Sequence, residues 1–443
     1  MGPQPIAVLP KGITTQAVGG FGKADIYVGT TQVPYYSKRP ANANDRSILS
    51  SFWVAGGPPP APLVPDPNLP FNPLTRYNPV PVAQGGIVTI PVLVTVPNAT
   101  ANGGNGCPKP AAGWPVVIVQ HGLFGDRTQA LAMADSYAEA CFIVAAIDMA
   151  LHGVTPNRPD GSPNPLAPLF YQAANERTFN VDLVNNTTLA PTPDGQIDRS
   201  GLHSFFAIIQ NPLMGRDNYR QSEVDVSLFA KSLVNLDVTG DAQPDVDPAN
   251  IHFTGLSGGG IVGIAHAKFS PGTRTAVVAA PAGILTQTAI ESPAFKDTIN
   301  RALGSQSTAF VPNSTFYNNF FRDAQTIVDP ADPINHICEC SMKQPLLLIQ
   351  VTGDTTVPNV STQRLVTAGE LPQITKLGAT PIGNEGVWVN FIKGNHGTLF
   401  DPTANANATK EMQTEAVTLA VTTNAGTPTV VISNTPETVV EVK

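Results

Sequence analysis

One serine of the chain lies in a setting that suits a catalytic nucleophile. The segment Gly255-Leu256-Ser257-Gly258-Gly259 follows an apolar run, residues 251–256, and precedes a run of small residues, 260–268. Glycines on both sides of a serine permit a sharp turn from strand into helix, and that turn holds the hydroxyl exposed at the end of a sheet. A Gly-x-Ser-x-Gly pattern is weak evidence by itself, but here both flanks fit it. Ser257 is therefore the candidate nucleophile.

A serine hydroxyl needs a base that the fold brings close from another element. The chain has seven histidines, and His396, in Gly394-Asn395-His396-Gly397, directly follows an apolar run at 387–392. The other six lie inside a predicted strand or helix, before the nucleophile, or in predicted insertions: His252, His266, His121, His152, His203 and His336. His396 is therefore the predicted base.

The acid that orients this imidazole is expected between nucleophile and base in chain order. Asp354 closely follows an apolar run at 346–351, at the end of a predicted strand. Asp329 and Asp332 are rivals, but both precede that run. Placement at a strand end favours Asp354.

An oxyanion hole needs backbone N–H groups aimed at the charge that develops on the substrate carbonyl. One donor is the residue after the nucleophile, Gly258. The second is expected from the segment His121-Gly122-Leu123-Phe124-Gly125, which follows an apolar run at 116–120. Leu123 is the first candidate and Phe124 the second. The alternative is that this segment is only the exit from a strand.

The elements that position these residues alternate between strand and helix. Such alternation predicts an α/β fold with a mostly parallel, doubly wound sheet. The predicted strands are 87–97, 116–120, 142–147, 251–256, 275–279, 346–351 and 387–392, with a helix at 128–140 after the second of them.

We expect one catalytic domain over residues 81–443, and residues 1–80, with a Pro-rich connector at 56–79, as an extension that wraps over it. A loop insertion at 152–214 and a lid or cap insertion at 281–343 interrupt the alternation. The second insertion is rich in aromatic side chains, which suit an acyl-binding wall or ordinary packing of a helical cap. The candidate substrate contacts are Phe124, Leu256, Phe316 and Phe320.

Four segments of the chain resemble the catalytic segments of α/β-hydrolase lipases and esterases. They are His121–Gly125, Gly255–Gly259, Asp354 with Val357-Pro358 behind it, and Asn395-His396-Gly397. Shorter motifs resemble the bacterial virulence-factor lipase group: Ile26-Tyr27-Val28-Gly29-Thr30, Val33-Pro34-Tyr35-Tyr36, Arg216-Asp217-Asn218 with Arg220-Gln221, and Val328-Asp329-Pro330 with Asp332-Pro333. The resemblance implies ester hydrolysis through an acyl-serine intermediate, with no organic cofactor. Leu256 and Gly258 depart from the side chains common in lipases, which affects the acyl pocket rather than the catalytic groups.

Composition limits the other classes of function. With 25 Lys and Arg against 33 Asp and Glu, the net charge is −8, which argues against a nucleic-acid partner. No apolar stretch reaches the roughly 18 residues that span a bilayer, so we expect no transmembrane segment. An ester substrate, as a small molecule or a polymer, and a monomeric state are predicted.

Cysteine usage and low charge predict a secreted, periplasmic or cell-surface protein. Only 13% of residues are charged, and the four cysteines are even in number and fit no zinc spacing. No leader is recognisable after Met1, so we interpret the chain as a mature form that begins with an added Met. A cytosolic protein with four free thiols is the alternative. Cys107 and Cys141 precede neighbouring predicted strands and are expected to pair, whereas Cys338 and Cys340 pair with each other or stay reduced.

An acidic loop at 237–247 offers carboxylates to a structural calcium ion through Asp237, Asp241 and Asp245. The loop lacks glycine at the sixth position of an EF-hand, and a solvated acidic turn is the alternative. An amidase or peptidase with the same three catalytic groups, and a catalytically idle hydrolase fold used for surface interactions, are the alternatives to an esterase. No member of the predicted catalytic set is missing, which disfavours the idle fold.

Overall fold

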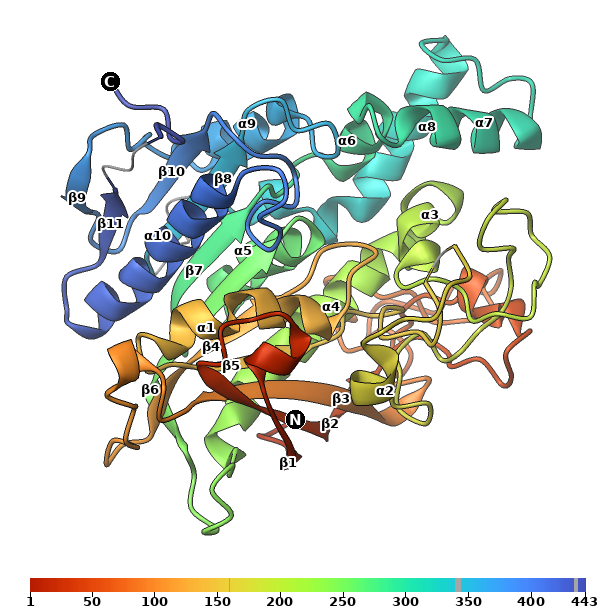
Figure 1. The fold of residues 1–443 in the computed structure, drawn as a ribbon. Coiled ribbons are helices and arrows are strands. Elements are labelled where there is room, and N and C mark those ends of the chain that lie inside the picture. Colours follow the sequence, from red (N-terminus) through yellow and green to blue (C-terminus); the bar gives the residue numbers. More distant parts are fainter. Residues whose placement is uncertain (159, 339–343, 434–436) are drawn as a thin grey trace.

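The computed structural model describes residues 1–158, 160–338, 344–433 and 437–443. Its centre is a nine-stranded sheet with helices on both faces (Figure 1). Six adjacent strands, from β5 to β10 in the order below, are parallel, and the other three are antiparallel to their neighbours. In spatial order the strands are β1 (Ile6–Thr14), β2 (Ala24–Tyr35), β3 (Gly86–Pro97), β5 (Ile143–Ile147), β4 (Trp114–Gln120), β6 (Val246–Leu256), β7 (Thr273–Ala279), β8 (Leu346–Val351) and β10 (Gly386–Phe391).

The predicted α/β fold with a mostly parallel sheet is confirmed. The apolar runs became central strands because side chains of successive residues point to opposite faces, and both faces are covered. In β4, Val116 and Ile118 lie in one buried cluster, while Val117 and Val119 lie in the other. Strand β4 therefore contributes to two hydrophobic cores, one on either side of the sheet.

Helices from distant parts of the sequence cover the two faces. Residues of α1 (Leu131–Ala138) and α10 (Ala406–Asn424) pack in the cluster with Val117 and Val119. The opposite cluster includes residues of α4 (Pro212–Ser232), α5 (Gly258–Phe269) and α9 (Asn359–Ala368). A small separate sheet pairs β9 (Gly378–Pro381) with β11 (Thr429–Ile432). None of the helices in the described ranges is both long and apolar enough to cross a bilayer.

The two insertions follow β5 and β7. The first contains α2 (Ala167–Phe170) and α3 (Leu202–Gln210), and α4 begins within its predicted range. The second contains α6 (Leu285–Glu291), α7 (Lys296–Gln306) and α8 (Thr315–Val328). In Figure 1 α7 and α8 lie together at one end of the molecule, away from the sheet.

The first 80 residues supply strands to the central sheet. β2 pairs with β3 over their full lengths, from Ala24 opposite Pro97 to Tyr35 opposite Gly86, and β1 forms the sheet edge. Whether these residues count as an extension around the core stays a prediction.

The predicted disulfide between Cys107 and Cys141 is confirmed, with 5.3 Å between the two Cα atoms. The bond forms because Cys107 lies shortly before β4 and Cys141 shortly before β5, and these strands are adjacent and parallel. Cys340 lies outside the described residues, so the pairing of Cys338 with it stays a prediction.

Candidate active site

Ser257 occupies a tight turn between β6 and α5. Its backbone has φ 56° and ψ −116°, a conformation that L-residues other than glycine rarely adopt. The turn is held by the Ser257 N–H, which donates to the Ala279 carbonyl of β7 at 2.8 Å. Gly255 and Gly259 permit it, because a Cβ on Gly255 would collide with the Gly259 oxygen, and one on Gly259 with the Gln120 oxygen. These contacts fix the serine at the carboxyl end of the sheet.

Asp354 and His396 form a hydrogen-bonded pair. Nδ1 of His396 lies 2.6 Å from Oδ2 of Asp354, and only 2% of the Asp354 side chain is exposed. The other carboxylate oxygen, Oδ1, accepts the backbone N–H groups of Thr356 at 2.8 Å and Val357 at 3.0 Å. Because a carboxylate is only an acceptor, Nδ1 carries the proton and Nε2 is left as the basic nitrogen. This is the tautomer that a general base needs.

The loop that carries His396 is shaped by local hydrogen bonds. Asn395 N–H donates to Thr398 Oγ1 at 2.7 Å, and Gly397 N–H donates to Asn395 Oδ1 at 3.0 Å. The imidazole side chain is 19% exposed, so the loop presents it at the surface of the sheet edge. Asp354 follows β8 and His396 follows β10, which is the neighbour of β8. Both loops therefore start from the carboxyl ends of parallel strands, and Ser257 lies at this same end of the sheet.

Most of the other histidines are buried and held neutral. Both ring nitrogens of His252 and of His266 are hydrogen-bonded to hydroxyl or amide groups within the core. Burial lowers the pKa of His252 to about 4, and it lowers the pKa of His266 and of His152 to about 3. Such groups cannot exchange protons with a substrate near neutral pH.

A second Asp–His pair lies in the first insertion, where Asp198 Oδ2 and His203 Nε2 are 2.7 Å apart. Asp198 also accepts the backbone N–H groups of Leu183 at 2.8 Å and Val184 at 3.2 Å. These bonds tie the preceding loop to the start of α3. The pair therefore has a structural task, and it lies apart from the loops that follow β8 and β10 in the chain.

The loop after β4 approaches the serine closely. A Cβ on Gly122 would lie 3.1 Å from Ser257 Cβ, and one on Gly258 would lie 3.1 Å from the Leu123 nitrogen. The two candidate oxyanion donors, Gly258 and Leu123, thus come from segments that meet beside Ser257. Phe124 follows in the left-handed region at φ 66°.

His121 shapes this loop from within the core. Its Nδ1 donates to the Gly122 carbonyl at 2.8 Å, and its Nε2 accepts the Met149 N–H at 3.0 Å. Burial lowers the pKa of His121, which keeps the ring neutral in this bridging role. His121 therefore anchors this segment to the end of β5, and the role of the segment as an oxyanion loop stays a prediction.

A buried ionic network lies next to the predicted oxyanion loop, and no sequence motif indicated it. Arg127 begins the 3-10 turn Arg127–Ala130 and is 1% exposed. Its guanidinium bonds to Asp148 Oδ2 at 2.5 Å and to Glu176 Oε1 at 2.7 Å. The Arg127 N–H also donates to Asp148 Oδ1 at 2.7 Å. The three charges come from positions far apart in the chain, so residue spacing could not have revealed them.

The candidate substrate contacts are spread over different surroundings. Leu256 is 5% exposed and packs in the apolar cluster with Val117 and Val119. Phe316 is half exposed, and Phe320 helps to line a cavity of about 190 Å³ between α3, α7 and α8. Both rings pack edge-to-face on Phe310. Phe124 alone of the four belongs to the loop beside Ser257, and a substrate role for the others stays a prediction.

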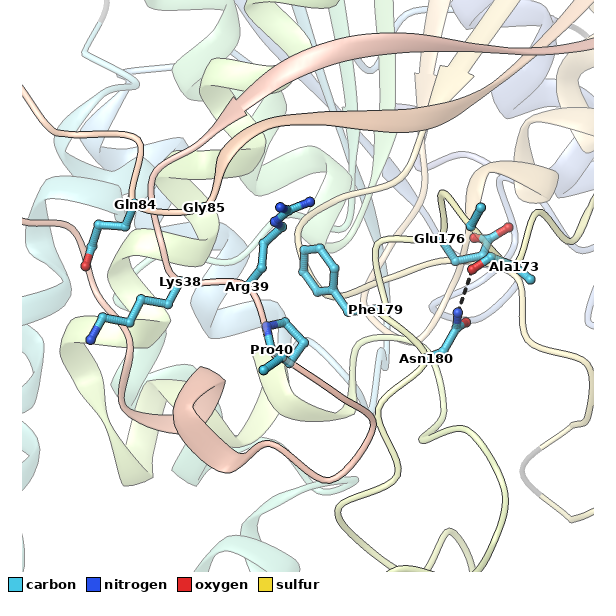
Figure 2. Close-up of a pocket in the computed structure, with 11 residues that line it drawn as sticks. Lys38, Arg39, Pro40, Gln84, Gly85, Ala173, Glu176, Phe179 and Asn180 are labelled. Carbon is cyan, nitrogen blue, oxygen red and sulfur yellow. Dashed lines mark hydrogen bonds between the residues drawn. The ribbon is translucent and has the colours of Figure 1, made fainter.

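None of the predicted catalytic residues lines a cavity of about 700 Å³, whose lining residues are shown in Figure 2. Lys38 and Arg39 lie on one side of it, and Glu176, Phe179 and Asn180 come from a separate loop. Glu176 also bonds to Arg127. The Asn180 side chain donates to the Ala173 carbonyl at 2.6 Å and closes its own loop.

The three carboxylates of the acidic loop do lie together, within 4.8 Å of one another. The Lys109 ammonium bonds to Asp245 and lies 3.5 Å from Asp241. Asp237 and Asp245 also accept backbone N–H groups of the loop, so protein donors already satisfy much of the cluster. A lysine in this position competes with a cation, and calcium binding stays a prediction.

No protein-family model matches the chain, and no curated protein matches it in sequence. Among solved structures it is similar to acetyl xylan esterase 1 from Thermoanaerobacterium sp. JW/SL YS485, with 14% identity and a TM-score of 0.45 over 93% of this chain and 88% of that one. It is similar to an acetyl xylan esterase from Paenibacillus sp. R4, with 12% identity and a TM-score of 0.47 over 94% and 89%. It is also similar to an acylaminoacyl peptidase from Pyrococcus horikoshii, with 11% identity and a TM-score of 0.43 over 79% and 41%.

The architecture of the chain itself defines its class. A mostly parallel sheet carries a serine at the strand-to-helix turn after β6, and an Asp and a His follow later strands in that order. A glycine-containing loop from an earlier strand lies beside the serine. This combination is the α/β-hydrolase fold.

Proposed function

We propose that this protein is a serine carboxylic-ester hydrolase that uses Ser257, His396 and Asp354. The observation that carries the proposal is the 2.6 Å bond between His396 Nδ1 and Asp354, at the sheet edge where Ser257 occupies a strained turn. That bond leaves Nε2 of His396 free to accept a proton from the Ser257 hydroxyl. The link between Ser257 Oγ and Nε2 is part of the proposal.

The reaction follows from these roles. His396 Nε2 takes the proton as Ser257 Oγ attacks the ester carbonyl carbon, and the carbonyl oxygen becomes negative. The N–H groups of Gly258 and Leu123 stabilise that oxygen, each worth about 2.7–4 kcal/mol if removed. The intermediate expels the alcohol, which receives the proton from His396. In the second half of the reaction His396 takes a proton from water as the water oxygen attacks the acyl-serine carbonyl. The acid is then released, and Ser257 Oγ receives the proton from His396.

We infer further that the protein acts outside the cytoplasm on acyl esters, with lipids and polyesters among the candidate substrates. The Cys107–Cys141 disulfide supports an oxidising compartment. The aromatic cap after β7 supports an apolar acyl group.

The test is the hydrolysis of p-nitrophenyl esters from acetate to palmitate by the wild type, Ser257→Ala and Ser305→Ala. Ser305 lies exposed on α7 and serves as the matched control. We expect Ser257→Ala to abolish turnover and Ser305→Ala to leave it unchanged, and the preferred chain length separates an esterase from a lipase. A folded wild type that cleaves none of these esters, or a Ser257→Ala variant that retains the rate, contradicts the proposal.

A further inference from the structure

The segment Arg199-Ser200-Gly201 is attached directly to the predicted oxyanion loop. Ser200 Oγ donates to the Gly125 carbonyl at 2.6 Å and accepts the Gly153 N–H at 3.0 Å. A Cβ on Gly201 would lie 2.9 Å from the Phe124 nitrogen and would collide with His152. At φ 71° this position suits glycine, which allows the two backbones to approach. The loop of the first insertion thus lies against the loop beside Ser257.

The Arg199 side chain lies over the ring of Phe124, with 4.7 Å between its Cζ and the ring centroid. Phe124 directly follows Leu123, a candidate oxyanion donor, and its ring also lies near the ring of Phe295, at 6.3 Å between centroids. The Arg199 backbone is fixed as well, because its N–H donates to Asn186 Oδ1 at 2.8 Å. The guanidinium is therefore held beside the predicted oxyanion loop.

Within the described part of the chain, Arg199 has no ion-pair partner, and its buried Nε has no hydrogen-bond acceptor. The preceding Asp198 does not neutralise it, because both of its oxygens bind Leu183, Val184 and His203. Burial lowers the pKa of Arg199, and no carboxylate opposes this effect. A partly buried cation without a counter-charge is unfavourable unless something else supplies the charge.

Several other buried or partly buried arginines among the described residues are paired with carboxylates, and Arg274 bonds instead to the Asn250 side-chain oxygen and the Thr423 carbonyl. Arg127 contacts Asp148 and Glu176, and Arg216 contacts Asp217 at 2.7 Å. Arg199 differs from them in that its charge faces an aromatic ring of the predicted site. The cation–aromatic contact orients the guanidinium but contributes only about 0.5–2 kcal/mol, and it leaves the N–H donors available.

We propose that Arg199 is a specificity residue that binds an anionic group, a carboxylate or a phosphate, carried by the ester substrate. The proposal rests on the proposed esterase function and refines it. A guanidinium presents N–H donors in a planar fork that matches both of these groups, and its position beside Phe124 places it near the ester being cleaved. The enzyme would then prefer esters with a charged group over neutral esters of the same size.

The test compares two pairs of esters in the wild type, Arg199→Met and Arg199→Lys. The first pair is mono-p-nitrophenyl adipate and p-nitrophenyl octanoate, so the charge is a carboxylate in the acyl part. The second pair is p-acetoxyphenyl phosphate and p-tert-butylphenyl acetate, so the charge is a phosphate in the alcohol part. Dividing kcat/KM for the anionic ester by that for its neutral partner, and comparing this ratio between variants, cancels the intrinsic reactivity of each ester.

We expect Arg199→Met to lower at least one of these ratios by about 10- to 100-fold, because a hydrogen bond to a charged group contributes about 1.5–3 kcal/mol. The pair whose ratio falls identifies the anionic group. Arg199→Lys should restore part of the preference. Arg76→Met is the matched control, since Arg76 lies 4.5 Å above the exposed ring of Tyr77, and it should change neither ratio.

Methionine keeps an unbranched stem over Phe124, so a packing role would lower the rates on neutral and anionic esters alike. A parallel loss of this kind, or unchanged ratios in both pairs, overturns the proposal. Failure of the esterase function is a separate outcome, because the wild type would then cleave none of the four esters.

Discussion

Replacing Asp354 by Asn tests the orientation of the catalytic base. Asp354 Oδ1 accepts two backbone N–H groups, from Thr356 and Val357, while Oδ2 accepts His396 Nδ1 at 2.6 Å. In Asp354→Asn the amide has one oxygen and one NH2 group. If the oxygen keeps the two backbone bonds, the NH2 group faces Nδ1 and forces the proton to Nε2. His396 then cannot take the Ser257 proton.

The alternative orientation keeps the bond to His396 but places the NH2 group against two backbone N–H donors, which is unfavourable by the loss of both bonds, about 1–3 kcal/mol each. The wrong tautomer is therefore preferred, and kcat should fall by about 10⁴, equivalent to about 5.4 kcal/mol in the activation free energy. The assay is p-nitrophenyl ester hydrolysis at saturating substrate, with circular dichroism to confirm folding. Asp329→Asn, the rival acid of the cap, should retain full activity. A folded Asp354→Asn enzyme within tenfold of the wild type would refute this reasoning.

Three further perturbations test the predicted oxyanion loop, the disulfide and one buried histidine. Gly122→Ala places a Cβ 3.1 Å from Ser257 Cβ, so the oxyanion loop must shift and kcat should fall about tenfold or more, while thermal unfolding shows a small change in Tm. Reduction of Cys107–Cys141, which closes a loop with a sequence separation of 34, should lower the free energy of unfolding by about 3–4 kcal/mol, and an unchanged urea midpoint in dithiothreitol would contradict this. Burial lowers the pKa of His252 to about 4, below the value of about 6.5 in the unfolded chain. Between these two pH values the unfolded state binds more protons than the folded state. The folded protein therefore loses stability as the pH falls from about 6.5 to about 4. His252→Gln should therefore reduce the slope of unfolding free energy against pH in this window by about 1.4 kcal/mol per pH unit, measured by urea titrations, and an identical slope would exclude the effect.

The sequence predicted the parts of the fold that depend on local patterns. Strands such as β4 and β6 were evident because both faces of a central parallel strand are buried, which produces an uninterrupted apolar run. The Asp–His pair was predicted because each residue follows such a strand directly. The same logic placed Cys107 and Cys141 near one another, since their strands are adjacent.

Helix α4 could not be predicted from the hydropathy pattern of the sequence. The helix begins at Pro212, inside the range predicted as a loop insertion, and it buries polar residues as well as apolar ones. Asp217 accepts the Trp53 N–H at 2.7 Å, and Gln221 binds Pro34 and Tyr36 through its amide group. These side chains are polar because they satisfy the backbone of the N-terminal segment, which a hydropathy pattern cannot show. The Arg216 to Gln221 motif therefore holds the first residues of the chain against the core.

The proposed specificity residue, Arg199, could not be predicted from the sequence for a related reason. Arg199 is one of several arginines in the sequence, and nothing in its neighbours marks it as unpaired. Only the structure shows that Arg199 lacks an ion-pair partner among the described residues, because the neighbouring Asp198 bonds to His203 and to the loop backbone. The structure also shows that Ser200 and Gly201 contact the predicted oxyanion loop. Catalytic groups at strand ends are fixed by the sheet, which the sequence encodes locally. A substrate-recognising group on an insertion is fixed by long-range contacts, and for this reason Arg199→Met should alter which esters are preferred while leaving the chemistry of Ser257 and His396 intact.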